Sequence, residues 1–282
     1  MPATSPEIIL LDNGSVKVAA TLQLRKLADN LQTAVGRKVN PVSLRHADRI
    51  DAAQLAGQPA QTLVTFLAQQ LAKGQRKFIL LPLFFAKSGA LTKYLPNLLE
   101  TLREQQGDFD LELADVVYPL PQGEPAMLQL FWQPLKQMLA QASAQAHIVL
   151  VDHGSPDPQV TAVRQHLAQQ LRAQSGLINP LDEAVMERRD GAQYDFNGEL
   201  LETVLRRKAQ QGVTEILLLM QFFLPGRHAG EGGDIEQICH RIESEFEGLK
   251  IVVSPLVAQN PLLIPVLQTR LKQAEASFHL PD

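Results

Sequence analysis

Short apolar runs alternate along the chain with longer segments in which apolar residues recur every three or four positions. The short runs predict strands, and the longer segments, such as "PQVTAVRQHLAQQLRAQ" and "DIEQICHRIESEFEG", predict amphipathic helices. The expected strands lie near 7–11, 39–44, 78–85 and 112–118 in the first half, and near 147–152, 183–187, 215–222 and 249–254 in the second. Strands that alternate with helices are typical of parallel sheets covered on both faces, so the pattern predicts an α/β protein.

The order of these elements repeats within the chain. Residues 8–31 align on residues 148–171 without a gap, and "FILLPLFFAKSGALTKYLPNLL" then aligns with "EILLLMQFFLPGRHAGEGGDIEQI" through their Phe-Phe pairs. Identical pairs in the first block include Asp12/Asp152, Gly14/Gly154 and Ser15/Ser155. Two matched blocks in the same order indicate a duplication. We therefore predict two tandem domains, 1–130 and 140–282, each with a small, mainly parallel sheet flanked by helices.

Charge and cysteine content narrow the classes of function. The 282 residues include 26 basic and 30 acidic side chains, a balance that lacks the basic surplus of a nucleic-acid-binding protein. The single cysteine, Cys239, excludes a disulfide framework and suits a reducing compartment. The N-terminus lacks the basic start of a signal peptide, and the most apolar runs are far shorter than the ~20 residues of a membrane-spanning helix. We therefore expect a cytoplasmic protein that binds neither nucleic acid nor membranes.

Candidate chemistry lies where the strands of the second half end. His153 follows the first of these strands, Glu187 ends the second, and His228 follows the third. Ligands of open parallel sheets bind beyond the carboxyl ends of the strands, so these side chains are expected at one edge. Two imidazoles and a carboxylate suit a borderline divalent metal such as iron, cobalt, nickel or zinc. The sequence therefore predicts a metal site at this edge.

Three segments of the second half resemble a known family. "VDHGSPDPQVTAVRQHLAQQL", "MERRDGAQYDFNGELLE" and "LLMQFFLPGRHAGEGGDI" are similar to motifs of the class II, ATP-independent tetrapyrrole chelatases. The similarity is greatest to the sirohydrochlorin cobalt- or ferrochelatases in their long, two-domain form. The resemblance implies two chelatase-like domains, a metal site made by His153 and His228, and an assisting carboxylate at Glu187. No glycine-rich G-x-x-x-x-G-K-[ST] nucleotide loop occurs in the chain.

The resemblance also implies a substrate. Sirohydrochlorin carries eight carboxylates, so its pocket is expected to contain cations. The candidate residues for binding the tetrapyrrole are Ser155, Arg188, Arg189 and Arg227. Arginine suits this task because its guanidinium can bind a carboxylate through two hydrogen bonds.

The expected reaction is the insertion of Co²⁺ or Fe²⁺ into sirohydrochlorin, in cobalamin or sirohaem biosynthesis. No cofactor is expected beyond the substrate metal. Two alternatives remain open: a non-catalytic carrier of metal or tetrapyrrole, and a nickel chelatase that acts on a related macrocycle.

The first half lacks the same chemistry at all three aligned positions. Asn13 stands in the place of His153, Ala90 in the place of His228, and Arg45 in the place of Glu187. Asparagine and alanine are poor metal ligands, and an arginine repels a dication. We therefore predict that 1–130 is a degenerate chelatase-like domain and that 140–282 carries the metal site.

Overall fold

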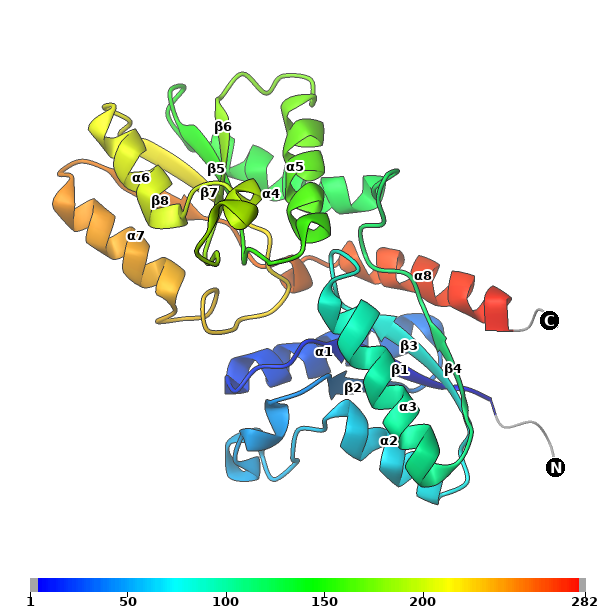
Figure 1. Cartoon of the computed structure of the whole chain (residues 1–282). Coiled ribbons are helices and arrows are strands. Elements are labelled where there is room, and N and C mark those ends of the chain that lie inside the picture. Colours follow the sequence, from blue (N-terminus) through cyan, green and yellow to red (C-terminus); the bar gives the residue numbers. More distant parts are fainter. Residues whose placement is uncertain (1–4, 279–282) are drawn as a thin grey trace. The chain divides into compact units, whose positions relative to one another are not determined.

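The computed structural model describes residues 5–278 and forms two compact units, each with one four-stranded parallel sheet (Figure 1). The first unit takes the chain up to Pro119 together with the segment that starts at Ile264, and the second takes Leu120–Leu263. This architecture confirms the predicted α/β fold with two similar parallel sheets. Among the described residues, no helix combines the length and the apolar character needed to cross a membrane.

The first sheet has the strand order β2-β1-β3-β4. Its strands are β1 (Glu7–Asp12), β2 (Val39–Ser43), β3 (Lys77–Pro82) and β4 (Asp110–Leu113). The helices are α1 (Val18–Val35), α2 (Leu63–Ala72), α3 (Leu95–Gln106) and α8 (Leu263–Phe278), with short turns η1 (Ala47–Arg49), η2 (Ala52–Leu55) and the π-helical η3 (Ala90–Tyr94). Side chains of α2 and α3 share one apolar cluster with one face of the central strands.

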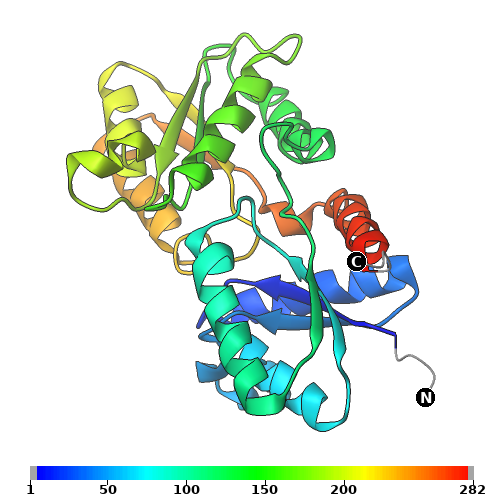
Figure 2. The same ribbon diagram turned by 45° about the vertical axis from the view of Figure 1, so that its right-hand side comes forward.

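The second sheet repeats this order as β6-β5-β7-β8. Its strands are β5 (His147–Asp152), β6 (Leu181–Val185), β7 (Glu215–Met220) and β8 (Lys250–Val253). The helices are α4 (Pro125–Leu139), α5 (Pro158–Arg172), α6 (Leu201–Gln210) and α7 (Asp234–Glu245), with short turns η4 (Ala192–Asn197) and η5 (Val257–Gln259). Helices α6 and α7 cover one face of the sheet, while α4 and α5 lie on the other (Figure 2).

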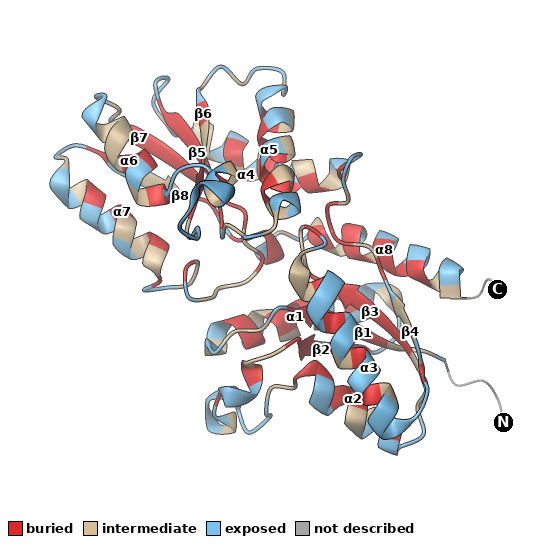
Figure 3. Cartoon of the chain, viewed as in Figure 1, coloured by how far each residue is buried: buried red, intermediate tan, exposed pale blue. Residues whose placement is uncertain are grey.

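The central strands are buried on both faces, which explains their near-continuous apolar sequences (Figure 3). In β5 and β7 every residue is buried, including His147 and Glu215 at their starts. The edge strands β4 and β8 carry exposed residues at both ends and contain charged side chains. The central strands therefore carry long apolar runs, whereas β4 and β8 do not.

The units depart from the expected segments 1–130 and 140–282 in the placement of two helices. Helix α4 follows β4 in sequence but belongs to the second unit, and α8 follows β8 but belongs to the first. In the first unit, the buried Arg270 of α8 donates to the Val116 carbonyl at 2.9 Å. The last strand of the first half, expected at 112–118, instead spans Asp110–Leu113, and the chain after it is bound by Arg270 at the Val116 carbonyl.

Candidate metal centre

Three strand ends of the second unit bring His153, Glu187 and His228 together. His153 follows β5 directly, Glu187 lies two residues after β6, and His228 lies in the loop between β7 and α7. One potential ligand atom from each side chain lies within 4.8 Å of the other two. The two imidazole rings meet edge to face, with centroids 4.8 Å apart. The three side chains predicted from sequence thus form one cluster at the carboxyl edge of the sheet.

Gly154 allows the turn that bears His153 to approach the backbone of Glu187. Its φ is +83°, and a Cβ at this position would lie 1.9 Å from the Glu187 carbonyl oxygen. The Glu187 amide donates to the His153 carbonyl at 2.9 Å, which fixes the two turns side by side. Any other residue at Gly154 would push the two ligand-bearing turns apart.

His228 is buried and its ring is oriented by a carboxylate. Its Nδ1 lies 2.7 Å from Asp234 Oδ2, and its Nε2 lies 3.2 Å from Glu187 Oε1. Burial, together with the neighbouring His153, lowers the pKa of His228, although Glu187 and Asp234 act in the opposite direction. A neutral imidazole that donates from Nδ1 to Asp234 leaves the Nε2 lone pair facing the centre of the cluster.

His153 is exposed, and a backbone carbonyl orients its ring. Its Nδ1 lies 3.1 Å from the Gly154 carbonyl oxygen, which can only accept a hydrogen bond. The N–H of the neutral ring therefore belongs on Nδ1, and Nε2 keeps a free lone pair. Both imidazoles thus have an Nε2 available as a ligand.

The loop before α7 depends on glycines for close packing. A Cβ on Gly233 would lie 2.7 Å from the carbonyl oxygens of both His228 and Gly230. Gly230, Gly232 and Gly233 lie between His228 and this helix. In the structure they form a packed turn, Gly233 is the N-cap, and the Asp234 carboxylate binds His228.

The three arginines predicted to bind the tetrapyrrole make different contacts. Arg227, with a side chain that is 74% exposed, pairs with Glu187 and Asp234 at 3.5 Å and 3.3 Å. Arg188 donates to the Gly198 carbonyl, and Arg189 lies over the Tyr194 ring.

The fourth predicted residue, Ser155, has a local structural use. Its Oγ accepts a hydrogen bond from the Asp157 amide, in a turn just before α5. Its backbone N–H and carbonyl both bind the Asn197 side chain.

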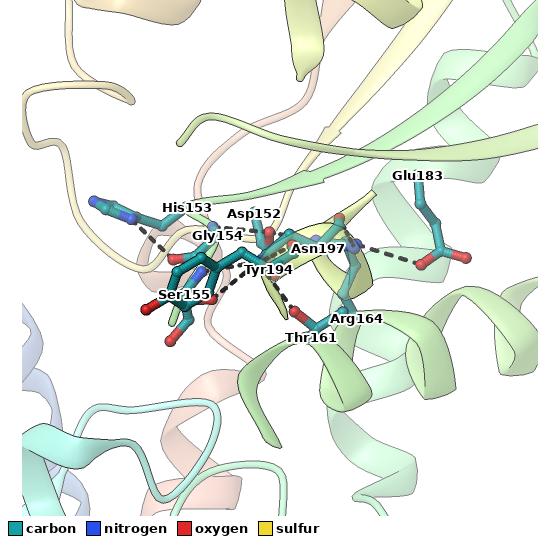
Figure 4. Close-up of polar contacts among 9 residues, drawn as sticks. All are labelled: Asp152, His153, Gly154, Ser155, Thr161, Arg164, Glu183, Tyr194 and Asn197. Atoms are coloured by element: carbon teal, nitrogen blue, oxygen red, sulfur yellow. Dashed lines mark hydrogen bonds and ion pairs between the residues drawn. The ribbon is translucent and has the colours of Figure 1, made fainter. Parts of the chain in front are cut away.

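Sequence reasoning missed the residues that hold the cluster in place. Asp152 and Arg164 form a buried ion pair at 2.7 Å below the His153 turn (Figure 4). Burial raises the pKa of the Asp152 carboxyl, and the Arg164 guanidinium opposes this change. The sequence contains only weak signs of these supporting residues: an Asp directly before His153, an Arg on an otherwise apolar helix face, and an Asp six residues after His228.

Comparison with known proteins gives one match to a family model. Residues 147–274 match the CbiX family model. No curated protein matches the sequence of the chain.

Several solved structures share the fold. SirB from Bacillus subtilis with Fe³⁺ is 12% identical, with 96% of each chain covered and a TM-score of 0.69. The sirohydrochlorin chelatase SirB from Bacillus subtilis subspecies spizizenii in complex with cobalt is also 12% identical, with 96% of this chain and 95% of that chain covered and a TM-score of 0.67. CbiX, described as the terminal enzyme of sirohaem biosynthesis in denitrifying bacteria, is 13% identical, with 95% and 99% covered and a TM-score of 0.59.

The two four-stranded parallel sheets of this chain have the fold seen in these chelatase structures. The segment that matches the CbiX family model contains His153, Glu187 and His228.

Proposed function

We propose that the protein inserts a divalent metal, Co²⁺ or Fe²⁺, into sirohydrochlorin, and that His153, Glu187 and His228 hold the metal before transfer. The observation that carries this proposal is the cluster of three ligand atoms within 4.8 Å of one another, with His228 oriented by Asp234. The match of residues 147–274 to the CbiX family model supports the reaction, and the iron and cobalt bound by SirB support the choice of metals.

The donor set suits a metal that must later leave. Two neutral imidazoles and one carboxylate supply three ligands, which leaves positions open for water and for the macrocycle. In the neutral tautomer, His228 Nε2 and Glu187 Oε1 are both acceptors, yet they lie only 3.2 Å apart. A dication between them would turn this repulsive contact into two favourable ones. The closeness of these two acceptor atoms therefore favours binding of a cation at the site.

The reaction also releases two protons, because a macrocycle with two pyrrole N–H groups exchanges them for M²⁺. Glu187 and His153 are both exposed, so they can accept protons at the site and pass them to solvent. This role gives Glu187 a purpose that a carrier protein does not need. The position of Glu187 in the cluster therefore favours a chelatase over a carrier.

The substrate carboxylates are assigned to the arginines beside the cluster. Arg227 lies against Glu187 and Asp234 with most of its side chain exposed, so it is available to a carboxylate that approaches the metal. Arg188 and Arg189 lie on the loop that follows Glu187. We also propose a cytoplasmic location, because the buried Cys239 is unpaired and the chain has no second cysteine.

A spectrophotometric assay tests the proposal. Purified protein is mixed with sirohydrochlorin and, in turn, Co²⁺, Fe²⁺ or Ni²⁺, without nucleotide. We expect insertion of cobalt or iron, and a rate at least about 100-fold lower in His153→Ala and His228→Ala, as for loss of an acid–base group or metal ligand.

The exposed His240 on α7 provides the control, because His240→Ala removes an imidazole that is not one of the three clustered residues. Insertion of nickel alone would identify the nickel alternative. Tight metal binding through His153 and His228 without any insertion would identify a carrier.

A further inference from the structure

A buried amide holds the turn that carries His153. The Asn197 side chain is completely buried and makes hydrogen bonds with three residues (Figure 4). Its Oδ1 accepts from the Ser155 amide at 3.0 Å and from Thr161 Oγ1 at 3.2 Å. Its Nδ2 donates to the carbonyls of Ser155 at 2.9 Å and Tyr194 at 3.2 Å. Both backbone polar groups of Ser155, two residues after His153, are therefore fixed by one side chain.

Arg164 holds the same turn from the other side. Its Nη1 donates to Asp152 Oδ1 at 2.7 Å, and its Nη2 donates to the Asn197 carbonyl at 2.7 Å. The same Asp152 oxygen accepts from the Gly154 amide at 3.0 Å. The residues immediately before and after His153 are thus tied to one buried guanidinium. We call Asn197 and Arg164 the turn clamp.

The segment that contains Asn197 also contacts the turn that carries Glu187. The Val185 amide donates to the Glu199 carbonyl at 3.0 Å, and Arg188 Nη1 donates to the Gly198 carbonyl at 3.0 Å. Residues 197–199 therefore bind both ligand-bearing turns. A displacement of this segment would change the separation between His153 and Glu187.

The first unit lacks the turn clamp. Leu24 takes the place of Arg164 in the sequence repeat. Pro59 lies three residues before Thr62, which bridges Ser43 as Leu200 bridges Val185, so Pro59 takes the place of Asn197. A cavity of about 460 Å³ lies at these positions and is lined by Leu24 and Pro59. The unit that lacks His153, Glu187 and His228 at its aligned positions thus also lacks the clamp residues, although it keeps the Asp and Thr that the clamp binds.

We propose that Asn197 and Arg164 are positioning residues that hold His153 at its observed distance from His228 and Glu187. Neither side chain belongs to the three-residue cluster, so each acts through the backbone around His153. The purpose of this positioning rests on the proposed function, whereas its geometry rests on the hydrogen bonds alone.

The test uses the full chain and two Asn197 variants. Asn197→Ala removes all the side-chain hydrogen bonds, while Asn197→Asp keeps the size but loses the donors to Ser155 and Tyr194. Two controls accompany them. Thr161→Val removes only one bond to the same amide, and Val204→Ala loosens the buried core of the second unit without touching the turn.

The first readout needs no metal. Nuclear Overhauser contacts between the His153 and His228 rings should be present in the wild type, the Thr161 variant and the Val204 variant, because the rings are 4.8 Å apart. They should be lost or strongly weakened in both Asn197 variants. The second readout is Co²⁺ titration, in which both Asn197 variants should bind at least about 10-fold more weakly, as expected for loss of a residue that orients a ligand. Arg164→Lys, which keeps the charge but not the bond to Asn197, should show a smaller loss in the same direction.

Unchanged ring contacts and unchanged Co²⁺ affinity in both Asn197 variants would overturn the proposal. So would an equal loss of affinity in Val204→Ala at the same melting temperature, because the effect would then be general loosening. Arg164→Lys with wild-type contacts and affinity would remove Arg164 from the clamp. If the wild type fails to bind Co²⁺ but the ring contacts still depend on Asn197, the positioning role stands and the proposed function fails.

Discussion

The carboxyl ends of the two sheets have the same backbone and opposite chemistry. In each unit a glycine with positive φ allows close approach of the next turn: a Cβ on Gly14 would lie 1.7 Å from the Arg45 carbonyl oxygen, and one on Gly154 would lie 1.9 Å from that of Glu187. This correspondence confirms that Arg45 takes the place of Glu187. The turn geometry is therefore preserved where the ligand chemistry is not.

The side chains at the first site suit a different role. Asn13 replaces His153, and the Arg45 guanidinium lies 5.3 Å from the centre of the Tyr94 ring. Within residues 5–278, the only group of three or more side chains placed to bind a metal is the one in the second unit. The two units thus share a strand-end framework, and the proposed metal site depends on three side chains of the second unit.

The two units also differ in the surroundings of a buried aspartate. Asp12 and Asp152 occupy equivalent positions, but only Asp152 pairs with a buried arginine. Burial raises the pKa of Asp12 from 3.8 to about 6, and hydrogen bonds from Ser43 and Gly14 only partly oppose this. The first unit thus buries a carboxyl without a cation, and the second buries an ion pair.

The largest expected contrast is between Asp152→Asn and Asp12→Asn. Asp152→Asn removes the closer of the two carboxylates that pair with the buried Arg164 and leaves only Glu183 at 3.3 Å, which should lower the free energy of unfolding by about 3 kcal/mol. Asp12→Asn leaves no such charge and removes a carboxylate that is costly to bury, so its effect at pH 7 should be small or stabilising. Denaturant unfolding of both variants measures the difference. Equal losses would show that the two aspartates have the same environment.

The pH dependence of stability should also distinguish Asp12. Its pKa is higher in the folded state than the ordinary value of 3.8, so its contribution to stability is complete below about pH 4 and is lost as the pH rises through about 6. The loss amounts to roughly 3 kcal/mol at most, at about 1.4 kcal/mol for each pKa unit.

Asp12→Asn should remove this part of the pH dependence between pH 4 and pH 7. Unfolding measured at several pH values in the wild type and the variant provides the check. An unchanged slope in Asp12→Asn would show that another group causes the effect.

The third expected effect concerns Asp234, whose partner His228 is replaced by Ala90 in the first unit. Asp234→Ala should weaken Co²⁺ binding about 10–100-fold, because His228 loses the acceptor that fixes its tautomer and orientation. Glu245→Ala, which removes one charge from the same helix α7 but pairs only with Arg206 on the surface, is the matched control. Equal affinities in the two variants would exclude an orienting role for Asp234.

The sequence predicted the strands and the three ligand candidates because both depend on local pattern. Apolar runs set the buried strands, and residues that follow strands of a parallel sheet must meet at one edge. The exchange of α4 and α8 between the units was not predictable, because both helices have apolar faces that would suit either sheet. Asn197 was also missed, since it lies in a polar loop and its function depends on contacts with residues 42 positions earlier.

The central claim is that the metal chemistry resides in one of two similar strand-end sites. The most direct test is a Co²⁺ titration of the full chain in three forms: wild type, His153→Ala and Asn13→Ala. The two substitutions change equivalent positions of the repeat to the same residue. We predict one Co²⁺ site per chain in the wild type, affinity at least about 10-fold weaker in His153→Ala, and affinity within about 2-fold of wild type in Asn13→Ala. Equal losses in both variants, or a loss in Asn13→Ala alone, would contradict the claim.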